Sequence, residues 1–418
     1  MSQKFVNPWD ATQAINGSVY GTPVFASGAE SGTSVYTAPA SKFFTPEIGA
    51  PARHVNWVLK GLGDVAIQGL QHQSMQFFGA GTWAPTCIGY ARSNRGFVVG
   101  SSTTVTFTRD GNVSHGSLIM IPSVGQPKVV HDDGTHIVEF ENSGAIVKFA
   151  SSSTVTSTVT TGSTVPFAAA TVGANSVLIA TSGTAAIAFG WSSTVSLPTI
   201  STVAVPAGTF NFSSTALWGS AQVFKGATTT TGNVLFYSRG SLSNNALFSP
   251  DCVTLSKSTW TGLTGYDKIA DVAYDADQSV FVAACYSSTG SALKFFTSAD
   301  GAAVWALSAT ATGPANLQVP SGAVDGTVAF TICAGVWFIA ITSNQFANYV
   351  YGTSADSGKR VVGMYSLDYG QTWYPAAIDM AAASSGATLK LVSSVDQILV
   401  KHDSDIAISG RIGYNEII

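Results

Sequence analysis

Charged residues are scarce in this sequence. Only 10% of its 418 residues are Asp, Glu, Lys or Arg, and the formal net charge is −4. This balance argues against binding nucleic acid through a broad basic surface, which needs an excess of positive charge. The low charge does not indicate disorder, because hydrophobic residues make up 45% of the chain and disorder requires low hydrophobicity with high net charge.

Long apolar runs are also missing. No stretch approaches 18 uninterrupted apolar residues, and no apolar segment typical of a signal peptide follows the first four residues. We therefore expect no membrane insertion, and synthesis in a cytoplasm.

Recognisable chemical motifs are lacking as well. The four cysteines show no CxxC or Cys/His ligand spacing, so we expect buried, reduced thiols at Cys87, Cys252, Cys285 and Cys333. No P-loop, helix-opening GxGxxG, GxSxG or HExxH motif occurs. The sequence therefore predicts no catalytic residue, no cofactor-binding residue and no cofactor.

The N-terminal part, residues 1–80, differs from the rest. Residues 1–45 are rich in Gly, Ser, Thr, Ala and Pro and have little periodicity, which predicts an extended arm that a partner orders. From Pro51 to about Met75, apolar residues recur at spacings of three and four and predict one short helix. Gly61, Gly63 and Gly69 weaken this helix by about 1 kcal/mol each relative to Ala, so it needs packing against its own domain or against another subunit.

Residues 81–418 contain a repeat. Its first landmark is a turn followed by a short apolar run, and Thr and Val, which favour strands, are abundant around it. Seven runs occur, at Gly96–Val99, His136–Phe140, Ser176–Ile179, Asn233–Phe236, Ser279–Val282, Val336–Ile339 and Gln397–Val400. Such short apolar runs predict strands that are buried on both faces.

A second landmark follows each run: an alternating strand that ends in a polar turn and leads into another short strand, as at Thr372–Pro375 and Val304–Leu307. Each repeat thus offers about four strands. Four-stranded sheets repeated radially form a β-propeller, so the sequence predicts an all-β fold, a seven-bladed β-propeller. The last repeat lacks a fourth strand, and residues 82–85, which resemble residues 372–375, are expected to complete it and close the ring.

Ser366–Trp373, with the sequence Ser-Leu-Asp-Tyr-Gly-Gln-Thr-Trp, resembles the Asp-box (BNR repeat) of sialidase-like β-propellers. Ser298–Trp305 is a looser copy with its Trp also five residues after the Asp, and the turns at Asp110 and Asp251 are degenerate copies. A short carboxylate that accepts backbone N–H bonds suits a tight hairpin. We therefore expect Asp368 to stabilise a turn at the rim.

The resemblance to sialidase-like propellers also implies a glycan hydrolase as one alternative. The Arg-Ile-Pro motif of that family is absent, and a solvated surface role is expected for most of the arginines of the repeat region, which are Arg92, Arg95, Arg109, Arg239, Arg360 and Arg411. His131–His136 combines two imidazoles with two carboxylates, but Asp-Asp-Gly is ordinary hairpin chemistry, so no metal site is predicted. The chain is not expected to be an enzyme.

Phe44–Trp57 resembles the N-terminal segments of bacteriophage tail-fibre and tail-associated proteins. This resemblance implies a virion structural protein made in the bacterial host cytoplasm. Its N-terminal arm and helix would bind other virion proteins in a homo-oligomer. The propeller would serve assembly and attachment to a host surface glycan. A carbohydrate-binding, lectin-like propeller remains the alternative, because aromatic side chains with Ser, Thr and Asn-rich turns also suit sugar contact.

Overall fold

A computed structural model describes part of the chain. The described residues are 75–78, 87–91, 96–100, 104–108, 120–122, 127–141, 145–150, 155–160, 165–182, 185–195, 198–207, 217–222, 233–241, 246–302, 304–314, 318–319, 325–333, 335–342, 361–376, 389–393, 397–402 and 407–412. The expected arm and the expected helix before Met75 lie outside them. The chain divides into two units, residues 1–76 with 412–418 and residues 77–411. The account below concerns the second unit and the strands at its ends.

The described residues form an all-β structure without a helix. Correspondingly, they contain no helix long and apolar enough to cross a membrane. The described strands pair in antiparallel order into seven sets of four that we call blades, numbered 1 to 7 along the chain. A short pairing of residues 240–241 with residues 268–269 joins blades 4 and 5 into one eight-stranded sheet.

The first three blades follow the chain order. Blade 1 contains β2 (Cys87–Ala91), β3 (Gly96–Gly100), β4 (Thr104–Thr108) and β5 (Met120–Pro122). Blade 2 contains β6 (Pro127–Asp132), β7 (His136–Glu141), β8 (Ala145–Ala150) and β9 (Val155–Thr160). Blade 3 contains β10 (Val165–Val172), β11 (Asn175–Ser182), β12 (Ala185–Ser192) and β13 (Ser201–Val203).

The next three blades repeat the pattern. Blade 4 contains β14 (Leu217–Gln222), β15 (Val234–Ser241), β16 (Ala246–Ser249) and β17 (Ser256–Ser258). Blade 5 contains β18 (Lys268–Asp275), β19 (Val280–Tyr286), β21 (Lys294–Ser298) and β22 (Ala306–Leu307), and a small separate sheet joins β20 (Ser291–Ala292) to β23 (Gln318–Val319). Blade 6 contains β24 (Val328–Cys333), β25 (Val336–Thr342), β26 (Val361–Ser366) and β27 (Tyr374–Ala376).

Blade 7 combines the two ends of the repeat region. It contains β28 (Leu389–Ser393), β29 (Gln397–His402), β30 (Ala407–Ile412) and, as its fourth strand, β1 (Met75–Phe78). Residues 82–85, to which the sequence assigned this strand, lie outside the described residues, so the fourth strand begins seven residues earlier than expected. Met-Gln-Phe-Phe has a higher strand propensity than the stretch from Gly81 to Pro85, which begins with Gly and ends with Pro.

The second strand of every blade coincides with one of the seven apolar runs predicted from the sequence. These strands are buried on both faces, as β3 and β7 show along their whole length. The apolar clusters lie between adjacent blades. One of them joins Ile88, Phe97 and Val99 of blade 1 to Leu399 of blade 7, so the first and last blades pack together. Full burial of one such side chain contributes about 1.5–3 kcal/mol.

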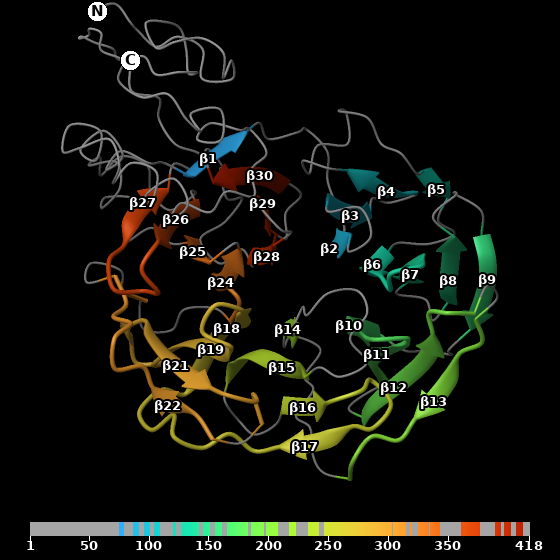
Figure 1. The fold of residues 1–418 in the computed structure, drawn as a ribbon, viewed down its shortest axis with the longest axis horizontal. Helices are drawn as coiled ribbons and strands as arrows, with labels where there is room; N and C mark the ends of the chain where they lie inside the picture. Colours follow the sequence, from blue (N-terminus) through green and yellow to red (C-terminus); the bar gives the residue numbers. More distant parts are fainter. Residues whose placement is uncertain are drawn as a thin grey trace, which may run out of the picture. The chain divides into compact units, whose positions relative to one another are not determined.

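The first strands lie nearest the centre in Figure 1, and the blades surround them. Because neighbouring strands are antiparallel, the turns after the first and third strands of every blade lie at one end, which we call the turn end. Two contacts at this end agree: Asn233 Nδ2 donates to the Asp300 carbonyl oxygen at 3.2 Å, and Ser193 N donates to Ala174 O at 2.8 Å. The other connections lie at the opposite end.

Candidate functional site

The first strands enclose a central cavity of about 180 Å³. Strands β2, β6, β10, β18, β24 and β28 contribute to its wall, and β15 adds two side chains. The polar side chains of the wall are Tyr90, His131, Asp132, Tyr237, Arg239, Asp271, Thr331, Lys390 and Ser393.

Arg239 connects four blades from inside the ring. It lies on β15 of blade 4 and is 5% exposed. Its Nε donates to Ala270 O of blade 5 at 2.8 Å, and its Nη2 donates to Val328 O of blade 6 at 2.7 Å. Its Nη1 donates to Leu389 O of blade 7 at 2.5 Å. The expected solvated surface role is therefore wrong for Arg239, because β15 continues past the predicted run at residues 233–236 and carries the side chain inside.

Asp271 of β18 lies beside this guanidinium. Its Oδ2 is 3.6 Å from Arg239 Nε and accepts a hydrogen bond from Phe330 N at 3.4 Å. Its Oδ1 accepts a hydrogen bond from the Tyr237 hydroxyl group. Burial raises the pKa of Asp271, and the Arg239 charge and the Tyr237 hydrogen bond only partly offset this. Burial and the nearby Asp271 carboxylate hold the pKa of Tyr237 well above its usual value. Asp271 and Tyr237 thus form a buried hydrogen-bonded pair inside the wall.

Lys390 of β28 brings a second cation to the cavity. Its side chain forms no hydrogen bond or ion pair with any residue that the structure describes. Part of the residue faces the cavity and remains accessible, yet protein surrounds it deeply enough that burial lowers the pKa of its ammonium group.

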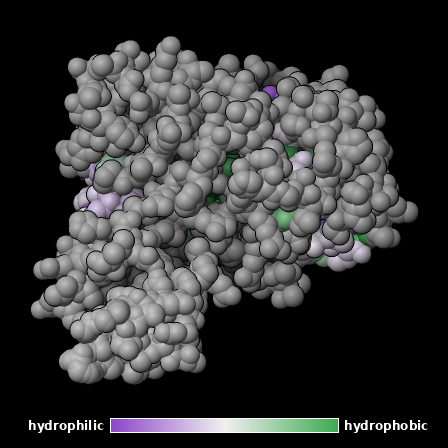
Figure 2. Space-filling model, turned by 90° about the horizontal axis from the view of Figure 1, so that it is seen from above, coloured by the Kyte–Doolittle hydropathy of each residue, from purple (hydrophilic) through white to green (hydrophobic). Residues whose placement is uncertain are grey.

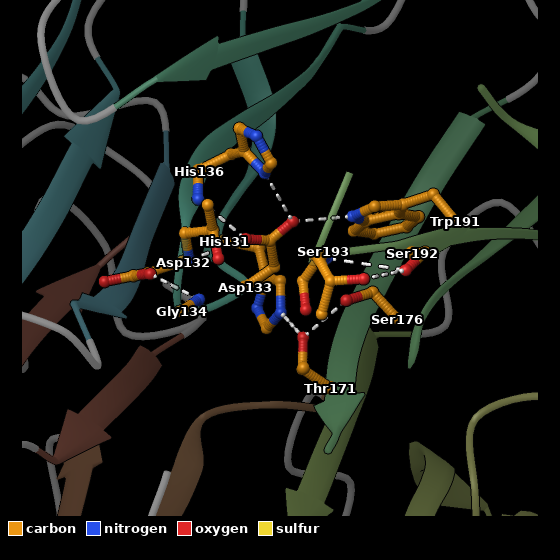
Figure 3. A network of polar contacts seen from close by, with 12 residues as sticks. His131, Asp132, Asp133, Gly134, His136, Thr171, Ser176, Trp191, Ser192 and Ser193 are labelled. Carbon is orange, nitrogen blue, oxygen red and sulfur yellow. Dashed lines mark hydrogen bonds and ion pairs between the residues drawn. The ribbon is translucent and has the colours of Figure 1, made fainter. Parts of the chain in front are cut away.

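A hydrogen-bonded chain joins blades 2 and 3 on another part of the wall. His131 Nε2 lies 2.7 Å from Thr171 Oγ1, which lies 2.8 Å from Ser176 Oγ (Figure 3). This chain gives His131 a fixed partner in the neighbouring blade. His131 is therefore held against β10, and its ring does not join His136.

Asp133 occupies the turn between β6 and β7. Its Oδ1 accepts the backbone N–H groups of Thr135 at 3.0 Å and His136 at 2.7 Å, while its Oδ2 accepts the Trp191 indole N–H at 2.8 Å (Figure 3). His136 Nδ1 lies 3.3 Å from the same oxygen. The two histidines thus have different partners, and no group of three His, Cys, Asp or Glu side chains within the described residues is placed to hold a metal.

Blades 5 and 6 use the same device as blades 2 and 3. Asp275, fully buried at the end of β18, accepts backbone N–H bonds from Asp277 at 3.0 Å and Gln278 at 3.2 Å. Its other oxygen accepts the Trp337 indole N–H of the next blade at 2.8 Å. Each of these carboxylates thus closes its own turn and binds a Trp of the following blade.

The Asp-box turn is a construction device at the turn end. In blade 6, Asp368 Oδ1 accepts the backbone N–H groups of Gln371 at 3.1 Å and Thr372 at 2.8 Å, while Ser366 Oγ accepts Gly370 N at 2.8 Å. Burial alone would raise the pKa of Asp368, but these backbone and hydroxyl hydrogen bonds lower it below its ordinary value. Trp373 covers the turn and stacks on Phe295 with the ring planes 14° apart.

Blades 4 and 5 repeat this turn, with a Ser at the end of the third strand and an Asp two residues later. Asp300 Oδ1 accepts Ala302 N at 2.8 Å, and Asp251 Oδ1 accepts Val253 N at 2.9 Å and Thr254 N at 2.7 Å. The Asp251 copy, degenerate in sequence, therefore has the same hydrogen bonds. Asp110 lies outside the described residues.

The sequence identified the turn residues and did not identify the cavity wall. All four cysteines are buried and free, as predicted. Tyr237, Asp271, Thr331, Lys390 and Ser393 were not predicted, because the first strands carry no repeated motif. The available signal was a single polar residue inside an apolar strand, as in Ile-Ala-Asp-Val at 269–272 and Leu-Lys-Leu-Val at 389–392. Of the six arginines of the repeat region, only Arg239 has a described side chain.

No protein-family model matches the sequence, and no curated protein matches it. Solved structures resemble the fold. One is a catalytically inactive virginiamycin B lyase variant from Staphylococcus aureus with quinupristin, at 9% identity and a TM-score of 0.50, over 81% of this chain and 99% of that chain. The fold is a β-propeller.

Two further structures have slightly lower scores. Sqt1 of Saccharomyces cerevisiae matches at 10% identity and a TM-score of 0.48, over 82% of this chain and 99% of that chain. The β-propeller domain of Cps50 (Swd1) from Myceliophteria thermophila matches at 7% identity and a TM-score of 0.47, over 80% of this chain and 99% of that one.

Proposed function

We propose that the chain is a bacteriophage virion protein, a tail or tail-fibre component without enzymatic activity. The resemblance of Phe44–Trp57 to the N-terminal segments of tail-fibre proteins carries this proposal. These residues precede the propeller in the sequence and lie outside the described residues. The N-terminal region would bind other virion proteins in a homo-oligomer, and the propeller would serve assembly and contact with a host surface glycan.

The structural role of the Asp-box favours this proposal over a sialidase-like hydrolase. A glycosidase works with carboxyl groups that are positioned on its substrate. The carboxylates of Asp251, Asp300 and Asp368 are instead engaged with backbone amides of their own turns. The Asp-box, the motif behind the hydrolase alternative, therefore supports a role in stabilising the turns of the propeller.

Cryo-electron microscopy of intact particles that encode this chain tests the proposal. We expect seven-bladed propeller density on the tail or its fibres, and antibodies against the propeller should label the same place. Mass spectrometry of purified particles should detect the chain, as a control that it is present in them in sufficient amount. Particles that are complete and infectious without this chain would contradict the proposal.

A carbohydrate-binding propeller is the second candidate function, favoured by a central cavity whose wall carries hydroxyl, carboxylate and ammonium groups. A glycan array with the whole protein separates it from a purely structural role. Binding to no bacterial surface polysaccharide would count against it.

A further inference from the structure

Lys390 is the cavity cation that lacks a compensating partner. Arg239 is paired with Asp271 and with four backbone carbonyl groups, and the Asp132 carboxylate accepts Gly134 N at 2.8 Å. Lys390 has no such contact with any described residue. Lys390 is only partly buried, yet its ammonium group has no acidic partner of its own among the described residues, so this position favours an anion from outside the chain.

A second lysine lies beside this cation. Lys390 on β28 lies directly opposite Lys401 on β29, and residues paired in this way carry their side chains on the same face of the sheet. Lys401 is 9% exposed. This face of blade 7 therefore carries two positive groups.

The remaining charged and titratable groups around Lys390 come from three other strands. They are Cys87 of β2, Arg239 of β15 and Asp271 of β18. Asp271 is the acidic member, and it is held by Arg239 and by the Tyr237 hydroxyl. Arg239 and Tyr237 therefore already balance the charge of Asp271, which leaves Lys390 available to an anion.

Hydroxyl groups accompany this cation in the wall. Thr331 of β24 donates from Oγ1 to Ser393 Oγ of β28 at 3.3 Å, and both residues line the cavity. Hydroxyl groups both donate and accept, so they suit the hydroxyls of a polar organic molecule. The cavity volume of about 180 Å³ leaves room for one small molecule.

We propose that the central cavity binds a small hydroxylated carboxylate, such as an acidic monosaccharide, with Lys390 paired to its carboxylate and Thr331 and Ser393 bound to its hydroxyls. The site goes beyond the assembly role proposed above and does not depend on the protein being part of a particle. It also differs from the turn carboxylates, which lie at the end of the blades.

Isothermal titration calorimetry of the full chain with D-glucuronate and D-glucose tests the proposal. The two sugars differ in the carboxylate, so we expect glucuronate to bind at least tenfold more tightly. Lys390→Met should weaken glucuronate binding at least tenfold, Lys390→Arg should retain most of it, and Lys257→Met, at an exposed lysine on β17, should leave it unchanged. Affinity should fall as pH rises, because burial lowers the pKa of Lys390.

Thermal melting separates lost binding from lost folding. Lys390→Met removes a partly buried unpaired charge, so we expect it to melt at the same temperature as the natural protein or higher. Absence of glucuronate binding to the natural protein would overturn the proposal. Equal binding of glucose, or full binding by a folded Lys390→Met variant, would overturn it as well.

Discussion

Aspartates at the turn end and in the central cavity have opposite electrostatic environments. Asp368 and Asp251 accept two backbone N–H bonds each, and the pKa of both is lowered. Asp271 is held by one Tyr hydroxyl, one backbone N–H and a guanidinium at 3.6 Å, and its pKa is raised. The depth of burial decides the direction. Asp271 is buried deeply enough that desolvation outweighs its hydrogen bonds and the Arg239 charge, whereas Asp368 and Asp251 are only half-buried, so their hydrogen bonds outweigh it.

This difference separates construction from ligand contact. The turn carboxylates accept hydrogen bonds from their own hairpins. Asp133 and Asp275 each accept one further hydrogen bond from a Trp of the next blade. The cavity groups face one another and an open volume. On the face drawn in Figure 2, apolar residues of the described part are visible only as small separate areas.

Removal of Arg239 should have the largest effect on stability. Arg239→Met leaves carbonyl groups of three blades without their donor and Asp271 without its buried counter-charge. We expect a loss of about 3–5 kcal/mol in the free energy of unfolding, measured by urea denaturation. The control Lys257→Met should stay within about 0.5 kcal/mol. A loss below about 1 kcal/mol for Arg239→Met would show that the contacts of Arg239 with the neighbouring blades are not needed for stability.

The bond between Asp275 and Trp337 should have the next largest effect. Asp275→Ala leaves the buried indole N–H unpaired, which costs about 1–3 kcal/mol. A double-mutant cycle with Trp337→Phe should give a coupling energy of about 0.5–3 kcal/mol. Asp277→Ala, at an exposed position of the same turn, is the matched control. Additive effects of the two changes would argue against a bond between the blades.

Much of this architecture could be predicted from the sequence, whereas its interior could not. The second strands are buried on both faces and so read as apolar runs, and Ser366 to Trp373 carries its own turn chemistry. Lys390 and Asp271 lie on strands that are more than 100 residues apart in the sequence and meet only in the folded structure, so their shared cavity could not be predicted. The buried position of Arg239 could not be predicted either, because its partners are backbone carbonyl groups, which no pattern of side chains reveals.

Loss of a turn carboxylate should cost less. Asp368→Ala removes two backbone hydrogen bonds at a half-buried position, and we expect a loss of about 1 kcal/mol at neutral pH. Because the folded pKa of Asp368 is lowered, its contribution is present above the unfolded value of about 3.9 and disappears as pH falls through the folded pKa. Urea denaturation at several pH values should show the difference between the two proteins shrinking in acid. A difference that grows in acid would contradict this.

The smallest expected effect is a pH trend of opposite sign at Asp271. Its folded pKa is raised, so the stability that this carboxyl contributes is fully present below about 3.9 and is lost as pH rises through the folded pKa. Asp271→Asn does not titrate. Its free energy of unfolding should therefore rise relative to that of the natural protein as pH increases above about 4, until the folded pKa of Asp271 is passed. The opposite trend would mean that Arg239 dominates the site.

Carboxyl carbon NMR titration of the protein labelled at aspartate tests the central comparison most directly, with Asp271→Asn and Asp368→Asn variants assigning the two signals. The account predicts a pKa for Asp271 above the ordinary aspartate value and a pKa for Asp368 below it. Two values on the same side of the ordinary one would contradict it.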